Sequence, residues 1–444
     1  MKRTFFCIFI LMLAAVFSLS AIDFGLIISQ NAGIETIGAD EDSLKEGFSY
    51  STGVNPWLTV PIGKNDFGKF YLSAGLTVNF ANSREELITI IVIDEDEGIT
   101  ETEIKEFMDG TWSFVPELLR TELSLRLTDK MSLSAGRTHY RDPLGFVAGG
   151  LFDGAYFSLD LGRPGIFSAG LWYTGLLYKK TTEITMTDED QIVFNRKLDY
   201  SDLANTYFGS RRLLAALDWD IPSLTEWLSL HSAIISQTDL TGNKNRYHSQ
   251  YLTVKATVPA SIFTFNMGAC LQLSQLIPDK ELEDTETKIK LGLAGELGAS
   301  MAFPASFQNL LSLNARFSSG TVKDSVFSAF VPVTTQYQGD ILEVKLSGIS
   351  SIDLNYIARL NRYFSFSLGS ACYILSDLGT YKGYPGINEN YFLGAEFSGR
   401  LIWAPFSDLI INLGGGMFLP YSENAEGSRD IKWKINLSVS LMVL

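Results

Sequence analysis

Long stretches of the sequence alternate strictly between apolar and polar residues. In residues 261–275, SIFTFNMGACLQLSQ, the odd positions from Phe263 to Leu273 are apolar, and the even positions are small or polar. The last segment, IKWKINLSVSLMVL (431–444), alternates in the same way. A period of two is typical of β-strands whose two faces meet different surroundings, and no helix keeps this register. The pattern therefore predicts an all-β protein.

The length of these segments favours a membrane barrel over a soluble sandwich. Many run for roughly 12–16 residues, whereas soluble strands average ~5–6 residues and membrane strands ~9–11. Tight connections such as LTDKM and LGRPGI alternate with long ones such as 31–46, 83–108 and 181–204. Because an open sheet edge cannot survive in lipid, the sheet must close. We predict a closed antiparallel transmembrane β-barrel of about 18 strands (16–18), with short periplasmic turns and long extracellular loops.

The N-terminal segment predicts export. Lys2 and Arg3 precede an apolar stretch from Phe5 to Phe17, and small residues follow up to Ala21. This order is typical of a secretory signal peptide, so we assign residues 1–21 to the signal and 22–444 to the barrel. The alternative is an uncleaved anchor, although the apolar stretch is short for a spanning helix of ~20 residues. An exported chain with this strand pattern is expected in the cell outer membrane.

Composition narrows the functional classes. Charged residues make up 19% of the chain, below the typical ~25%, which suits a surface that partly faces lipid. The net charge of −15 argues against nucleic acid, which requires a basic patch. The acidic loops are expected to be solvated, with loose divalent-cation binding as the alternative. Cys270 and Cys372 are isolated and form no CxxC motif, so we expect neither a metal site nor a cofactor.

Aromatic residues near the predicted strand ends are expected to form the two interfacial girdles of a membrane barrel. Packing in a protein core is the alternative for the same residues. The set is Trp57, Trp112, Trp219, Trp227, Phe303, Trp403, Phe406 and Trp433.

A cluster of polar residues stands out in SAGRTHYRDPLGFVAGGLFDGAY (134–156). A hairpin centred near Gly145 pairs Ala135 with Ala155 on the lipid face and then Arg137 with Asp153. We predict that this opposite-charge pair staples the hairpin at the extracellular rim, for ~0.2–1 kcal/mol. Catalysis would require a nucleophile beside an oriented base, which this segment lacks, so no catalytic residue and no enzyme are predicted.

The loop of this hairpin, residues 138–152, is a candidate pore constriction. Folded inward, it would narrow the pore, with Arg141 as the cation, Asp142 as its counter-charge and His139 beside them. The alternative is ordinary loop chemistry at the rim, because Asp and Pro favour turns.

Charged residues in the lumen-facing phase of the strands are expected to line the pore. A cation on the lipid face near the midplane would cost ~2–4 kcal/mol, which argues for the inward assignment. The alternative role for these charges is pairing across the lumen, which would only stabilise the barrel. The predicted lumen-lining residues are Arg120, Glu122, Arg126, Arg212, Lys255, Glu296, Arg316, Lys345 and Arg400.

The run GRTHYRDPLGFVAGGLFDGAYFSLDLG (136–162) resembles a pore-lining hairpin of the 18-stranded substrate-selective outer-membrane porins, the alginate-export type especially. The resemblance implies passive diffusion of small polar or ionic solutes through a charged lumen. It also implies surrounding outer-membrane lipid and insertion by the barrel-assembly machinery. Leu444 stands where the assembly signal of such barrels ends in an aromatic residue, which indicates a variant signal.

Two other functions fit the same architecture. A fatty-acid-type transporter of hydrophobic substrates would have an apolar groove inside the barrel and a gap in the wall. A surface adhesin or structural barrel would have a plugged lumen. The sequence leaves the solute and the oligomeric state open.

Overall fold

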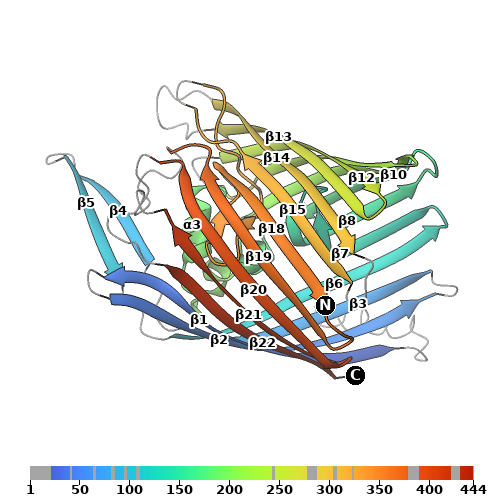
Figure 1. Cartoon of the computed structure of the whole chain (residues 1–444), viewed down its shortest axis with the longest axis horizontal. Helices are drawn as coiled ribbons and strands as arrows, with labels where there is room; N and C mark the ends of the chain where they lie inside the picture. The colour runs from blue at the N-terminus through green and yellow to red at the C-terminus, as the bar shows by residue number, and fades with distance from the viewer. Residues whose placement is uncertain are drawn as a thin grey trace, which may run out of the picture.

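The computed structural model describes residues 22–40, 43–63, 67–81, 86–94, 98–106, 111–242, 246–277, 288–303, 308–322, 325–378, 390–421 and 431–443. The predicted signal peptide, residues 1–21, and the terminal Leu444 lie outside these ranges. Within them the chain forms one closed antiparallel sheet of 18 strands (Figure 1).

Each strand of the barrel pairs with the next one along the chain, and β1 pairs with β22 to close the sheet. This confirms the predicted closed barrel of about 18 antiparallel strands. The strands are β1 (Asp23–Asp40), β2 (Ser43–Ile62), β3 (Gly68–Ala81), β6 (Thr111–Thr128), β7 (Met131–Arg141), β8 (Gly149–Asp160), β9 (Ile166–Tyr173), β10 (Arg212–Thr225), β11 (Leu228–Asp239), β12 (Arg246–Ala260), β13 (Phe263–Ile277), β14 (Lys288–Phe303), β15 (Asn309–Ser318), β18 (Ile349–Arg359), β19 (Phe364–Leu375), β20 (Phe392–Phe406), β21 (Leu409–Pro420) and β22 (Lys432–Val443).

The two faces of the strands differ as the alternation predicts. On β13, Met267 and Leu271 are exposed on the outer face, while Cys270 and Gln272 are buried on the inner face. Large apolar side chains are thus exposed on the outside of the barrel, where a soluble protein would bury them. The outer surface suits lipid, and the inner surface carries mostly small and polar groups.

One aromatic prediction is wrong. Trp57 lies on the inner face of β2, where its ring stacks on Tyr71 of β3 with centroids 6.4 Å apart. The guanidinium of Arg120 lies 5.1 Å from the Tyr71 ring centroid on the same inner face. Trp112, Trp219 and Trp403 are exposed on the outer face, as expected of girdle residues.

The first long loop is also different from its prediction. Residues 31–46 were expected to form an irregular loop, but the β1–β2 ladder continues through them up to Asp40 and Ser43. Pairing with β2 satisfies part of the backbone N–H and C=O groups of this polar stretch, so its sequence is compatible with a strand extension. Within 83–108, the described residues form a separate hairpin of β4 (Glu86–Asp94) and β5 (Gly98–Glu106).

Three connections at the long-loop end of the barrel pack against its inner wall. The β9–β10 connection, 174–211, contains α2 (Lys179–Thr182), α3 (Asp188–Asn195) and α4 (Leu203–Thr206). The β15–β18 connection contains β16 (Tyr337–Gln338) and β17 (Val344–Lys345). With the short loop 142–148, they form a buried apolar cluster against the inner faces of β10–β14. None of the described helices is long and apolar enough to cross a membrane.

Candidate functional site

The β7–β8 hairpin has the register predicted from its sequence, with Ala135 opposite Ala155 and Arg137 opposite Asp153. Arg137 donates from Nε and Nη2 to the two carboxylate oxygens of Asp153, each at 2.8 Å. The same guanidinium donates to the backbone carbonyls of Leu118 on β6 and Leu176 in the β9–β10 connection. Arg137 is only 5% exposed and Asp153 is partly buried, so this ion pair is largely shielded from water.

The position of Arg137 follows from a break in strand pairing. β7 pairs with β6 only from Thr121 to Thr128, although β3 pairs with β6 up to Thr111. Beyond Arg137 the hairpin turns inward, and in the described chain no strand pairs with that edge of β6. Side chains cover the edge instead: Tyr207 donates to the carbonyl of Pro116 at 2.6 Å, and the Tyr200 hydroxyl bonds the N–H and carbonyl of Phe114. The connection 174–211 thereby completes the wall.

The loop 142–148 folds into the barrel. The Asp142 carboxylate accepts hydrogen bonds from the backbone N–H groups of Leu144, Phe146, Val147 and Ala148 at 2.9–3.3 Å. These bonds close the loop into a compact turn whose apolar side chains join the buried cluster. Asp142 is 3% exposed, so its predicted role as a counter-charge in the pore is wrong. Its oxygens are occupied by its own loop and do not face a solute.

The other two predicted constriction residues are exposed on the part of the hairpin that turns inward. His139 is exposed and alternates with Thr138 and Tyr140, which are buried. Its predicted place at the constriction stays a prediction. Arg141 is exposed at the end of β7 and its guanidinium lies over Gly145. It forms no ion pair within the described part of the chain.

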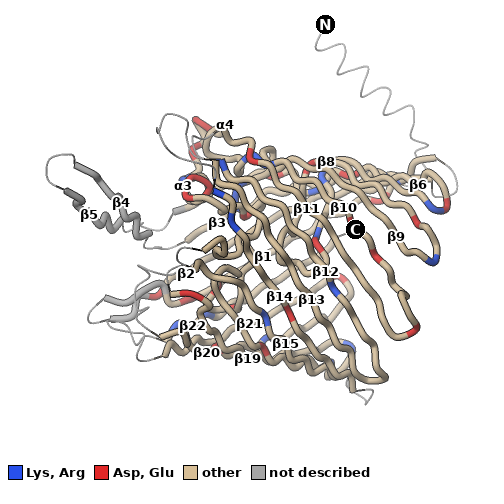
Figure 2. Tube along the Cα trace, turned by 90° about the horizontal axis from the view of Figure 1, so that it is seen from above, with Lys and Arg blue, Asp and Glu red and all other residues tan. Residues whose placement is uncertain are grey.

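Most of the predicted lumen charges lie on the inner face as ion pairs. Arg120 Nε donates to Glu122 at 2.7 Å, and Lys255 lies 3.1 Å from Glu296. The pair of Arg316 and Asp353 is wider, at 3.6 Å. Figure 2 shows acidic and basic positions interspersed along the strands, without a continuous stretch of one sign. Such pairing neutralises much of the lining and stabilises the wall.

Two predicted lining residues lie elsewhere. Arg212 is fully buried beneath α3, with nitrogen–oxygen distances of 2.6 Å to both Asp190 and Asp239. A capping box of Thr187 and Asp190 begins α3 and aims the Asp190 carboxylate at the wall. Arg212 therefore anchors the β9–β10 connection and does not contact solute. Lys345 lies on β17 and not on a barrel strand, and its Nζ donates to Gln191 at 3.0 Å.

A second inward turn, residues 337–343, is held by a carboxylate from the wall. We call it the tip segment. Glu396 on β20 is buried and accepts hydrogen bonds from the N–H groups of Asp340 and Leu342, at 2.7 and 3.0 Å. Gly339 has a φ of 84°, and a Cβ there would clash with the Tyr373 hydroxyl and the Glu396 carboxylate. Only glycine fits this close approach of the tip to the wall.

A polar cavity of about 390 Å³ separates the tip segment from the wall of β20–β22. Arg400 and Lys434 line the wall side, and Asp340, Glu343 and Glu183 line the opposite side. Lys434 Nζ lies 2.6 Å from Glu343, whereas Arg400 is exposed and has no ion-pair partner among the described residues. Burial raises the pKa of Glu183, and the neighbouring Glu343 carboxylate raises it further. The cavity thus has cations on one side and carboxylates on the other.

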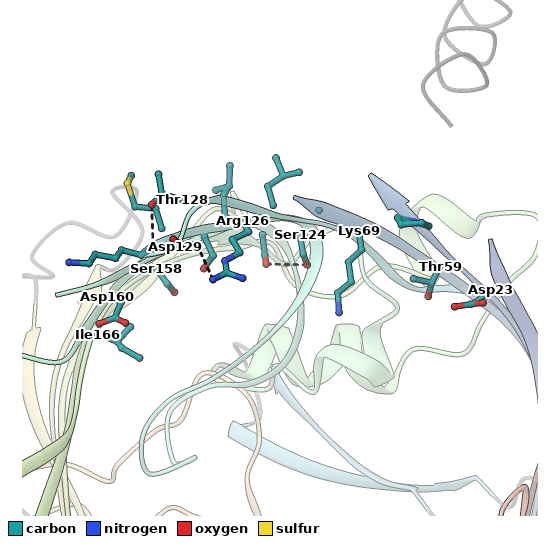
Figure 3. A pocket seen from close by; sticks show the side chains of 18 residues that line it. Asp23, Thr59, Lys69, Ser124, Arg126, Thr128, Asp129, Ser158, Asp160 and Ile166 are labelled. Atoms are coloured by element: carbon teal, nitrogen blue, oxygen red, sulfur yellow. Dashed lines mark hydrogen bonds and ion pairs between the residues drawn. The ribbon is translucent and has the colours of Figure 1, made fainter. Parts of the chain in front are cut away.

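A second cavity, of about 870 Å³ and lined by both polar and apolar residues, lies at the short-turn end of the barrel. Figure 3 shows Lys69 and Arg126 pointing into it from β3 and β6. Serines of β6–β8 also line it, together with the charged residues Asp23, Asp129, Lys130 and Asp160 and apolar residues such as Met131 and Ile166. We refer to it as the short-turn vestibule.

No protein-family model matches the sequence, and no curated protein matches it. Solved structures do match over nearly the whole chain. A BenF-like porin from Pseudomonas fluorescens Pf-5 has a TM-score of 0.57 and 8% identity, covering 96% of this chain and 99% of that one. OprD from Pseudomonas aeruginosa has a TM-score of 0.54 and 12% identity, covering 95% and 94%. OpdK from Pseudomonas aeruginosa, solved with vanillate, has a TM-score of 0.55 and 9% identity, covering 96% and 99%. The chain has the fold of the 18-stranded outer-membrane porins.

The sequence alone does not reveal the residues that hold the inward segments in place or that line the cavity beside the tip segment. Tyr200, Tyr207 and Asp190 lie in a connection without a period-two pattern, and so does Glu183. The capping box of Thr187 and Asp190 is the one local pattern that indicates a helix start there. Nothing in the sequence indicates that this helix packs inside the barrel.

Proposed function

We propose that the protein is an outer-membrane channel through which small polar or ionic solutes diffuse passively. The observation that carries this proposal is the polar cavity of about 390 Å³ inside a closed barrel, between the tip segment and the wall of β20–β22. The apolar cluster fills the β10–β14 side of the lumen, so this cavity belongs to the side that stays polar and accessible.

The chemistry of the cavity suggests how a solute would pass. Arg400 and Lys434 on the wall face Asp340 and Glu343 on the tip segment. Opposite charges on the two sides of a narrow, low-dielectric passage create a field across it, which orients a dipolar or ionic solute. Passage then needs no covalent step and no energy source. The inner-wall ion pairs keep the remaining lining polar without a large net charge.

The two alternative functions receive less support. The lumen contains apolar groups, but Val147 and Phe330 are completely buried by protein and line no groove for a lipid tail. The unpaired edge of β6 is covered by tyrosines and by Arg137, so it does not open the wall. An adhesin with a plugged lumen would not need the charged cavity.

Planar-bilayer recording of the purified protein tests the proposal. We expect discrete conductance steps and a reversal potential that differs from zero in a salt gradient. A correctly folded barrel, verified by heat-modifiable migration, that gives no steps would favour a structural or adhesive role. Vanillate is a suitable first organic solute, because the matched OpdK structure was solved with it. Its permeation through this chain would be measured by liposome swelling against a solute of similar size without charge.

A further inference from the structure

The short-turn vestibule differs from the cavity beside the tip segment in the arrangement of its cations. Its two inward cations come from neighbouring strands: Lys69 lies opposite Ser124, and Arg126 is the next inward residue after Ser124 on β6. Diagonal neighbours on one face of a sheet lie within reach of each other's long side chains. Lys69 and Arg126 therefore present two positive charges to the same space.

Lys69 and Arg126 are not held in close, buried ion pairs, although Asp23, Asp129, Asp160 and a third cation, Lys130, line the same cavity. Lys69 is exposed and has no carboxylate partner in the described chain. Arg126 lies 3.2 Å from Asp129, but both side chains are exposed, so this ion pair is weak. By contrast, Arg120 and Lys255, which lie farther along the inner wall, each have a close carboxylate. Two adjacent and weakly paired cations repel each other, and an anion bound between them would relieve that repulsion.

Hydroxyl groups surround the two cations. In the strand register, Arg126 lies opposite Ser132, which lies opposite Ser158, and Ser124 lies opposite Ser134. All four serines line the vestibule together with the cations (Figure 3). Ser134 donates to Ser124, Ser124 donates to Glu122, and Ser158 shares a hydrogen bond with Ser168, so these hydroxyls would have to exchange partners to contact an anion. Ser132 has no side-chain hydrogen bond among the described residues. The vestibule thus combines two point charges with donors spread over three strands.

We propose that the short-turn vestibule is a second binding site on the solute path. Its ligand is a tetrahedral oxyanion, such as inorganic phosphate or a soluble phosphate monoester. This inference rests on the proposed channel function. A dianion with three or more acceptor oxygens can contact Lys69, Arg126 and the Ser132 hydroxyl at once, and charge-assisted hydrogen bonds to the two cations are the strong ones. A planar monoanion would leave most of these donors unused.

The carboxylates of the vestibule favour release. Asp23, Asp129 and Asp160 line the same cavity as the cations, and Asp160 also caps the β8–β9 turn by accepting the N–H of Gly162 at 2.7 Å. Their negative charges would oppose long residence of an anion. The expected result is weak, reversible binding, as transport requires.

The test is a planar-bilayer recording of chloride current with inorganic phosphate added on the short-turn side. We expect phosphate to reduce the chloride current in a saturable way, and acetate at the same ionic strength to have little effect. In the double variant Lys69→Ser, Arg126→Ser, the phosphate concentration for half-reduction should rise about tenfold or more, because two charged donors are lost. Lys69→Arg keeps the charge and should retain most of the effect.

The matched control is Arg163→Ser, which removes an exposed cation from the β8–β9 turn outside the vestibule. It should leave the phosphate effect unchanged. The oxyanion site would be overturned if phosphate did not reduce the chloride current, or if it reduced the current equally in the wild type and the double variant. Either result would leave the channel proposal intact. Absence of any conductance would overturn the channel proposal itself.

Discussion

Arg137 and Asp153 form a bidentate ion pair at the point where the β7–β8 hairpin leaves the barrel wall and turns inward. The same guanidinium also bonds the carbonyls of Leu118 and Leu176, so it joins the hairpin to β6 and to the β9–β10 connection. An exposed pair would contribute little to stability, whereas breaking a buried pair leaves a desolvated charge without its partner.

Asp153→Ala is therefore expected to destabilise the barrel by ~3–5 kcal/mol, which should lower the temperature at which heat-modifiable migration is lost. Asp129→Ala, which breaks the exposed pair with Arg126, should cost at most ~1 kcal/mol. Equal transition temperatures for the two variants would contradict the structural role of the Arg137–Asp153 pair.

Asp142→Ala should release the loop 142–148 from the lumen. The substitution leaves the N–H groups of Leu144, Phe146, Val147 and Ala148 without their acceptor, at ~1–3 kcal/mol for each buried group. We expect larger or noisier single-channel conductance, because the loop no longer packs against the wall. Arg163→Gln is the control, since Arg163 is exposed in the β8–β9 turn and has no contact with this loop. Unchanged conductance in a folded Asp142→Ala barrel would show that Asp142 does not hold this loop in the lumen.

Arg400→Glu should shift the ion selectivity of the channel towards cations. Arg400 lines the cavity opposite the carboxylates of the tip segment and has no described ion-pair partner, so reversing its charge removes the free cation of the passage. The reversal potential in a salt gradient measures the shift. Arg141→Glu, at the start of the loop 142–148, should change it in the same direction but less. A larger effect at Arg141 would place the constriction at the 138–152 loop after all.

Selectivity should also depend on pH through Glu183. Its pKa lies above the usual glutamate range because of burial and the neighbouring Glu343, so Glu183 takes up a proton before exposed glutamates do as the pH falls. Protonation removes a negative charge from the cavity, and the reversal potential should move towards anion preference on acidification. The raised pKa also means that protonation favours the folded arrangement of this segment.

Glu183→Gln provides the control for this pH dependence. The variant should already show the anion-shifted reversal potential at pH 7, and its remaining change on acidification should be smaller. A wild-type titration that overlies that of Glu183→Gln would exclude Glu183 as the responsible group.

The barrel could be predicted from the sequence because a strand between lipid and water repeats its chemistry every second residue. That rule covers 261–275 and the Ala135–Ala155 register, and it correctly places Arg120, Glu296 and Arg400 on the inner face. It ends where the chain leaves the wall. Trp57 was misassigned because aromatic rings suit either an interface or a lumen, and only the phase of β2 decides between them.

The inward segments could not be predicted because their partners are remote in sequence. Asp142 was expected to face the pore, yet its acceptors are satisfied within six residues of its own loop. Arg212 has the phase of a lining residue, but α3 covers it, and that contact depends on Asp190, 22 positions away. Alternation gives the direction of a side chain and says nothing about what packs on top of it.

The unpaired edge of β6 has a consequence for pore engineering. A common way to widen a barrel channel is to delete its longest loop, and the β9–β10 connection would be the natural choice here. Its tyrosines, however, serve as the neighbouring strand for Phe114 and Pro116. Deleting residues 174–211 would leave polar backbone facing hydrocarbon, so the shortened protein would lose its seal against lipid before it gained a wider pore.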